Sequence, residues 1–390
     1  MEKINVLDVG QLPDVIRELR ALGIPAFIFG PPGIGKTEGI QAALEKDDIL
    51  IDLRASQLDP VDVRGVPVVV HAARELKEQI ELTTLKLEAA RKIGDEKLAQ
   101  TLEKRLAGLL KQEVVGEPQV VWSRPDFWPR EGKGIIVFEE LNTAPPSVQN
   151  TLLQPFGAPP GSDRFVGPHR IPKTFYLCAT GNRKEDQAHV ISLSSALRGR
   201  AVIINIPGPN LDSWTTWAVR NGIEPVVVAF IRFRPDLLYQ PPPAHDETAP
   251  FPSPRAWARF VSPLVARGFT TPEILAAAVG EEAAAEFLAF LREVDNMPDI
   301  DRLLVRPEEF DPQQLSVSVR YAVIAALIHR VISNPELLKP SLAIALKFEP
   351  EMAAVFISTL NRHSPEMRTR IVATAEAHRW VAKHSKLVRL

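Results

Sequence analysis

Eight residues near the N-terminus restrict what this chain can fold into more than any other feature. The segment Gly30-Pro31-Pro32-Gly33-Ile34-Gly35-Lys36-Thr37 fits the pattern G-x-x-x-x-G-K-[ST]. An almost wholly apolar run at 24–29 precedes it, and a segment with helical periodicity follows it at about 36–44. Such glycines let backbone N–H groups surround a phosphate, and a helix start adds partial positive charge. The motif therefore predicts a strand, a nucleotide-binding phosphate loop and a helix in succession.

Two side chains of this loop have expected roles of their own. Lys36 is expected to reach the β- and γ-phosphates of a nucleotide, and the Thr37 hydroxyl to bind Mg²⁺. The remaining residues, Gly30 to Gly35, are expected to contact phosphate mainly through their backbone. A chance match to the pattern in a chain of this length has a probability of roughly one per cent.

Four further apolar runs, at 49–53, 134–138, 174–179 and 201–206, have the character of strands buried on both faces. With the first run they predict an α/β fold of the P-loop NTPase type, a parallel five-stranded sheet with helices on both faces. After Pro207-Gly208-Pro209 the periodicity is helical, as in 316–332 and 365–386. We therefore expect a nucleotide-binding domain at 1–208 and an all-α region at 209–390.

The composition argues against several other classes of protein. Cys178 is the single cysteine, so an internal disulfide or a cysteine-rich zinc site cannot form. The formal net charge of −2 does not suit a general binder of polyanions. The chain lacks both the apolar run of about 20 residues that a membrane helix needs and the apolar core of a signal peptide. We expect a cytoplasmic protein without a membrane partner.

The third predicted strand ends in two carboxylates, Glu139 and Glu140. The carboxyl ends of parallel strands form the edge where ligands bind. Glu139 is expected to hold Mg²⁺, directly or through water, and Glu140 to activate the attacking water. The alternative is that both are ordinary polar residues leaving a buried strand.

The segment from Glu139 to Gln149 resembles the Walker B segment of MoxR-type AAA+ ATPases, Asp-Glu-Ile/Leu-Asn-Arg-Ala-Pro-Pro followed by Gln two residues later. Two residues depart from that pattern. Glu139 replaces Asp, which affects metal geometry, and Thr143 replaces Arg. The resemblance implies an ATPase that uses ATP and Mg²⁺.

Three later segments are similar to the same family, in the family's order. Leu177–Asn182 resembles its sensor 1 strand, which implies that Asn182 contacts the γ-phosphate or the attacking water. In 195–200 the resemblance makes Arg200 the trans-acting arginine finger, with Arg198 as a second candidate, although Ala201 replaces the usual Phe. Ser253-Pro254-Arg255 resembles the lid motif, which makes Arg255 sensor 2. The structural alternatives are a turn asparagine and solvated arginines.

The resemblance also implies a homo-oligomeric ring, a hexamer, that remodels a protein client. It makes the all-α region at 209–390 a lid with a helical C-terminal extension. A separate partner with a von Willebrand A domain is expected. Two other functions stay open. One is a nucleic-acid motor or restriction-type NTPase subunit, and the other is a nucleotide-controlled assembly switch with weak hydrolysis. The residues do not distinguish ATP from GTP.

Two segments outside the motifs have weaker signals. Residues 72–112 carry leucines at helical spacing on two faces with Gly94-Asp95 between them, which predicts a solvated helical hairpin inserted in the first domain. The C-terminal helical segment is basic and supplies the only support for a nucleic-acid partner. Its basic residues are Arg368, Arg370, Arg379, Lys383, Lys386 and Arg389.

Overall fold

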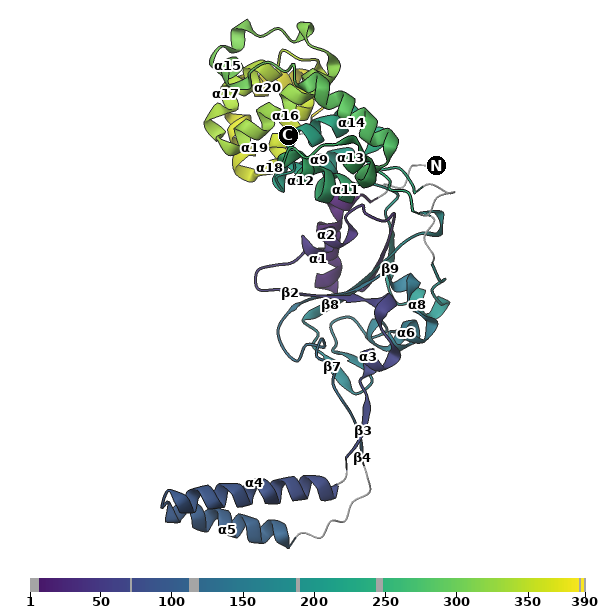
Figure 1. The fold of residues 1–390 in the computed structure, drawn as a ribbon, viewed down its shortest axis with the longest axis vertical. Coiled ribbons are helices and arrows are strands. Elements are labelled where there is room, and N and C mark those ends of the chain that lie inside the picture. Colours follow the sequence, from purple (N-terminus) through teal and green to yellow (C-terminus); the bar gives the residue numbers. More distant parts are fainter. Residues whose placement is uncertain are drawn as a thin grey trace.

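The computed structural model describes residues 7–70, 72–111, 119–186, 190–242, 248–385 and 387–388. At its centre is a five-stranded parallel sheet with the strand order β2-β5-β8-β1-β9 (Figure 1). All five strands lie within two residues of the predicted runs. Their bounds are β1 Ala26–Phe29, β2 Ile49–Arg54, β5 Gly134–Glu139, β8 Phe175–Gly181 and β9 Val202–Asn205.

Helices cover both faces of this sheet because the strand residues are apolar in both directions. In β5, Ile135 and Val137 pack into one core, whereas Ile136 and Phe138 pack into another. The first core lies under α1 Leu12–Leu22 and α2 Lys36–Gln41, a helix that ends three residues before the predicted limit. The second lies under α3 Pro60–Arg64, α6 Pro146–Thr151, α7 Leu153–Phe156 and α8 Ser195–Arg198.

Every element described after β9 is helical, so the predicted fold class, a P-loop NTPase sheet followed by an all-α region, is confirmed. These helices gather at the end of the molecule opposite the arm defined below (Figure 1). Among the described helices, none is both long and apolar enough to cross a bilayer. Their bounds are α9 Leu211–Arg220, α10 Pro225–Phe233, α11 Pro254–Ala256, α12 Ser262–Ala266, α13 Pro272–Val279, α14 Glu281–Val294, α15 Ile300–Val305, α16 Val317–Ser333, α17 Leu338–Ala345 and α18 Pro350–His363.

The C-terminal segment predicted as one helix consists of two, α19 Pro365–Ala373 and α20 Ala375–Lys383. Thr374, which separates them, has an extended backbone (φ −86°, ψ 115°). A β-branched residue tolerates that conformation well. The apolar periodicity of the sequence continues across Thr374, so the sequence did not predict this break. Two of the predicted basic residues, Lys386 and Arg389, lie outside the described residues.

Two short ribbons were not predicted from the sequence. β6 Arg164–Val166 pairs antiparallel with β7 His169–Ile171, and β3 Pro67–Val70 with β4 Gln119–Trp122. The second ribbon leads away from the sheet to the helical hairpin (Figure 1). We call the ribbon β3–β4 and its hairpin, together, the arm.

The helical hairpin of the arm consists of α4 Ala72–Lys92 and α5 Glu96–Leu110, and its predicted limit at Gln112 lies outside the described residues. Gly94 turns the chain with φ +74°, and the Asp95 side chain caps α5 by accepting from the Leu98 N–H at 3.0 Å.

The arm has an apolar core of its own, built from both helices. Leu87 of α4 packs with Ala90 and with Ala99 of α5, and this cluster is separate from the two cores of the sheet. An ion pair between Arg91 and Glu103 also joins the two helices. The arm therefore adds little to the packing of the nucleotide-binding domain.

We predict that replacing residues 71–118 by a short Gly/Ser turn between β3 and β4 changes the free energy of unfolding by less than about 1 kcal/mol, because no sheet-core contact is lost. Thermal unfolding measures the effect. Ile136→Ala, which opens a cavity in the sheet core, is the matched control and should cost about 2–5 kcal/mol. A loss as large as that control would mean that the arm supports the domain.

Candidate functional site

Three neighbouring strands bring the predicted site residues to one edge of the sheet. The phosphate loop follows β1, Glu139 ends β5, and Asn182 follows β8; these strands are adjacent in the order β5-β8-β1. Because all three are parallel, their carboxyl ends meet at the same edge. The predicted phosphate, metal and sensor residues are thereby assembled from segments far apart in the sequence.

The phosphate loop depends on glycine at two positions. Gly33 has φ +74° and Gly35 has φ +98°, backbone conformations that residues with a Cβ rarely adopt. Within the loop, Lys36 Nζ donates to Gly30 O at 2.8 Å and to Pro31 O at 2.9 Å. The loop thus forms a cradle of backbone with the ammonium group held inside it.

Burial lowers the pKa of Lys36 to about 8, against an ordinary value of 10.5. The negative charges of Glu139 and Asp186 oppose this shift, and the positive charges of Arg255 and Arg183 add to it. Lys36 Nζ donates its third hydrogen bond to Asn182 Oδ1 at 3.3 Å. A bound phosphate would supply the negative charge that the buried ammonium lacks, so the residues present fit a nucleotide.

The carboxylate of Glu139 is buried and fixed from two sides. Thr37 Oγ1 donates to Glu139 Oε1 at 2.7 Å, and Thr180 Oγ1 donates to Oε2. The two predicted metal ligands, Thr37 and Glu139, therefore lie in direct contact. One carboxylate and one hydroxyl, with phosphate oxygens, form the hard oxygen set that Mg²⁺ prefers.

Glu140 differs from Glu139 in both backbone and environment. Its backbone is left-handed (φ 56°, ψ 39°), which is uncommon for a residue other than glycine. Thr143 steadies this turn, since its N–H and its hydroxyl both donate to Glu140 O, at 2.9 and 2.8 Å. The carboxylate is 43% exposed and lies 3.8 Å from Arg54 Nη1. An accessible carboxylate in this position can accept a proton from water.

Asn142 is a site residue to which sequence reasoning assigned no role. Its Nδ2 donates to Asn182 O at 2.6 Å, and its Oδ1 accepts from the Asn182 N–H at 3.2 Å. Its own carbonyl accepts from Ile191 N at 2.6 Å. Asn142 therefore fixes the backbone of the predicted sensor residue. Its place in the Walker B resemblance was the only signal in the sequence.

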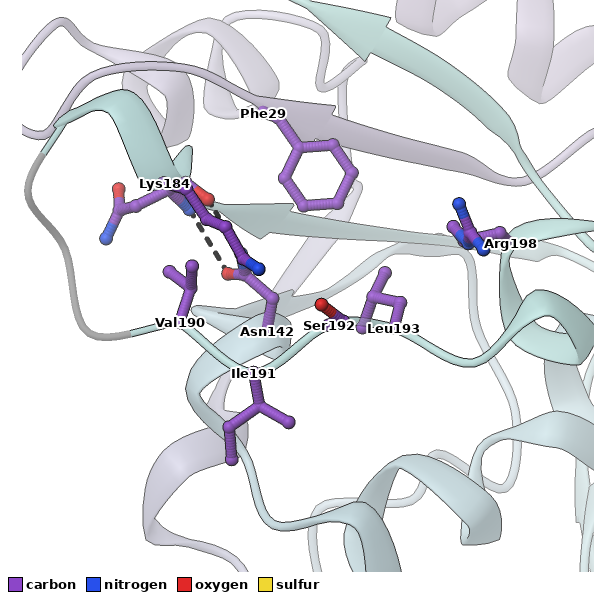
Figure 2. A pocket seen from close by; sticks show the side chains of 9 residues that line it. Phe29, Asn142, Lys184, Val190, Ile191, Ser192, Leu193 and Arg198 are labelled. Atoms are coloured by element: carbon purple, nitrogen blue, oxygen red, sulfur yellow. Dashed lines mark hydrogen bonds between the residues drawn. The ribbon is translucent and has the colours of Figure 1, made fainter.

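A cavity of about 260 Å³ opens beside this pair of asparagines (Figure 2). Arg198, at the end of α8, contributes to its wall together with Asn182 and Lys184. The structure thus brings Arg198 into the cavity of its own chain. The remaining lining residues are Phe29, Asn142, Val190, Ile191, Ser192 and Leu193.

Arg200 lies at the opposite edge of the sheet, where strands β1 and β9 begin. It comes just before β9, whose Val202 pairs with Ala26 at the start of β1, whereas the phosphate loop follows the end of β1. The four residues of β1 that separate the start of the strand from the phosphate loop span about 13 Å at 3.3 Å per residue. The exposed Arg200 side chain bonds Ala196 O and lies over Gly157, where a Cβ would come 2.7 Å from Nε. Arg200 is therefore not part of its own chain's site.

Arg255 lies in the first turn of α11, where the helical region meets the phosphate loop. Its backbone N–H donates to Gly33 O at 3.1 Å. A π-helical segment, Trp257–Val261, follows, and from it Arg259 pairs with Glu38 of α2 at 2.7 Å. Two bonds thus attach the start of the predicted lid to the loop and to the helix that follows it.

Neither a protein-family model nor a curated protein matches the chain. Among solved structures, NtrX from Brucella abortus in complex with ADP is similar over 96% of this chain and 68% of its own, with 13% identity and a TM-score of 0.34. A DNA polymerase III gamma subunit-related protein from Thermotoga maritima is similar over 97% and 92%, with 9% identity and a TM-score of 0.25. Since both TM-scores lie below 0.5, the fold assignment depends on the strand order and the phosphate loop.

The depressed pKa of Lys36 predicts a pH dependence of stability. Between pH of about 8 and 10.5 the unfolded chain binds more protons at this residue, so the free energy of unfolding rises with pH. Lys36→Met removes the cost of the buried charge. We expect this variant to be more stable than wild type at pH 7 by about 1–3 kcal/mol, with the difference closing towards pH 10.5.

Denaturant unfolding at several pH values measures this difference, and Lys184→Met, at an exposed lysine near the same cavity, is the control. A difference between Lys36→Met and wild type that does not vary with pH would contradict the assigned pKa.

Proposed function

We propose that this chain is a Mg²⁺-dependent ATPase of the AAA+ type, acting in an oligomeric ring. The observation that carries the proposal is the convergence of Lys36, Glu139 and Asn182 on one edge of the sheet, with Glu140 exposed beside them. These are a phosphate cation, a metal carboxylate and a polar sensor, as phosphoryl transfer requires.

Each residue of this edge has one step in the proposed reaction. Lys36 and the loop N–H groups bind and orient the phosphates. Thr37 and Glu139 would hold Mg²⁺, which when bound would neutralise charge on the phosphate oxygens. Glu140 accepts a proton from the attacking water. Asn182, held by Asn142, positions the γ-phosphate or that water, and Arg255 contacts the γ-phosphate from the lid.

The positions of Arg200 and β9 support a shared active site between subunits. Arg200 is exposed and lies at the edge of the sheet remote from its own phosphate loop. Beside it, Val202 and Ile203 of edge strand β9 are 41% and 43% exposed. An arginine flanked by exposed apolar side chains suits a contact with a second subunit, where it stabilises transition-state charge.

The MoxR resemblance extends the proposal to remodelling of a protein client, with a separate von Willebrand A domain partner and a hexameric ring. Among the basic residues of the described C-terminal helices, Arg370 pairs with Glu336 at 2.9 Å and with Glu366 at 3.4 Å, which reduces the positive charge on which the nucleic-acid alternative depends. The assembly switch differs from the main proposal only in its slow hydrolysis.

Glu140→Gln tests the chemistry, since an amide cannot act as a base. We expect this variant to bind ATP as wild type does and to lose at least 100-fold in kcat. Lys36→Ala, which removes the phosphate cation, should instead lose binding. Turnover and nucleotide affinity are measured separately; hydrolysis by Glu140→Gln at the wild-type rate would exclude this base.

Arg200→Ala tests the shared site. It should bind ATP normally and lose about 1,000-fold in turnover, the usual effect of removing an arginine finger. Mixing it with Lys36→Ala should restore part of the activity, because some interfaces then combine an intact loop with an intact arginine. A chain carrying both substitutions cannot restore activity and serves as control. Constant turnover per subunit down to monomeric dilution would argue against sharing.

A further inference from the structure

Helix α4 of the arm carries a second apolar stripe in addition to the face that packs on α5. Leu82 and Leu85 of α4 are 54% and 64% exposed, and Ala89 is exposed too. Ile93, one residue past the end of α4, is 75% exposed, and its N–H donates to Ala89 O at 3.1 Å, which continues the helical path. At 3.6 residues per turn these four side chains fall within an arc of about 80° and extend over about 16 Å of helix. Within the described residues no other element covers this stripe.

The stripe lies beside the buried face of α4 and is distinct from it. The buried face, with Thr83, Leu87 and Ala90, is centred roughly 120° away around the helix. Because α5 occupies only the buried face, the stripe stays accessible, and α4 can contact a helix of another molecule through it.

Charges beside the stripe indicate which occupant fits. Glu81 and Lys92 flank it on the same side, near its two ends, and within the described part of the chain neither has an ionic partner. Residues on the same flank meet when two helices pack antiparallel. Two α4 helices related by a twofold axis would therefore bring Glu81 of each copy to Lys92 of the other, with Leu85 opposite Ala89.

We propose that the arm is a self-association surface, in which α4 pairs antiparallel with α4 of a second copy of this chain. The interface is isologous, since the same patch is used by both copies. Neighbouring subunits within a closed ring are related by rotation about the ring axis, which does not bring their α4 helices together antiparallel. The arm therefore joins two assemblies, whatever number of subunits each contains. Lys86, on the other flank near the twofold axis, can extend its ammonium to solvent.

The first experiment measures the mass of the purified full-length chain by sedimentation over a range of concentrations. We expect Leu85→Asp, which places a charge in the centre of the stripe, to reduce the mass of the largest species by about half. ATP turnover should stay unchanged, because the arm shares no core with the nucleotide-binding domain. If the largest wild-type species has no greater mass than that of Leu85→Asp at any concentration, the proposal is overturned, and the stripe would instead bind a different protein.

The second experiment tests the antiparallel register by charge exchange. Glu81→Lys and Lys92→Glu should each weaken association roughly tenfold, because each places like charges at both ends of the pair. An equimolar mixture of the two variants should associate as wild type does, since a mixed pair restores opposite charges at both ends. Gln100→Lys, on the opposite side of the hairpin, is the control. Single variants that associate as wild type, or a mixture that does not recover, would exclude this pairing.

Discussion

The site depends on the parallel register of β5, β8 and β1. Phe138 lies opposite Ala179, so Glu139 comes beside Thr180, and the Thr180 hydroxyl holds the carboxylate from the neighbouring strand. A slip of one residue would turn each side chain to the other face of the sheet and bury a carboxylate without partners. Because both faces are packed with apolar residues, the register is fixed, and the geometry of the site follows from it.

The sequence was sufficient to predict the five strands and the loop because both have local signals. Apolar runs identify strands buried on two faces, and the spacing of Gly33, Gly35 and Lys36 identifies the loop. The supporting contacts of Asn142 and Arg54 were not predictable, since they depend on which strands are neighbours and in what register. The ribbon β3–β4 was missed for a related reason: its strands are only four residues long and are separated by the whole hairpin.

The arm and the nucleotide-binding domain differ in how they bury apolar residues. The domain buries apolar residues on both faces of a sheet, whereas the arm has one small core and leaves the apolar stripe along α4 exposed. A hairpin of two helices buries too little surface to be very stable alone. A second copy paired along α4 would bury additional apolar surface on the other side of that helix, so assembly would also stabilise the arm.

The bond from Arg255 N–H to Gly33 O joins the start of the helical region to the phosphate loop through backbone atoms alone. Its existence does not depend on which side chain occupies either position. Substitutions of the Arg255 side chain can remove a charge from the site while the mechanical connection persists. Only proline at 255 would delete the donor, because it alone lacks the N–H. This connection between the loop and the helical region therefore tolerates almost every single substitution at 255.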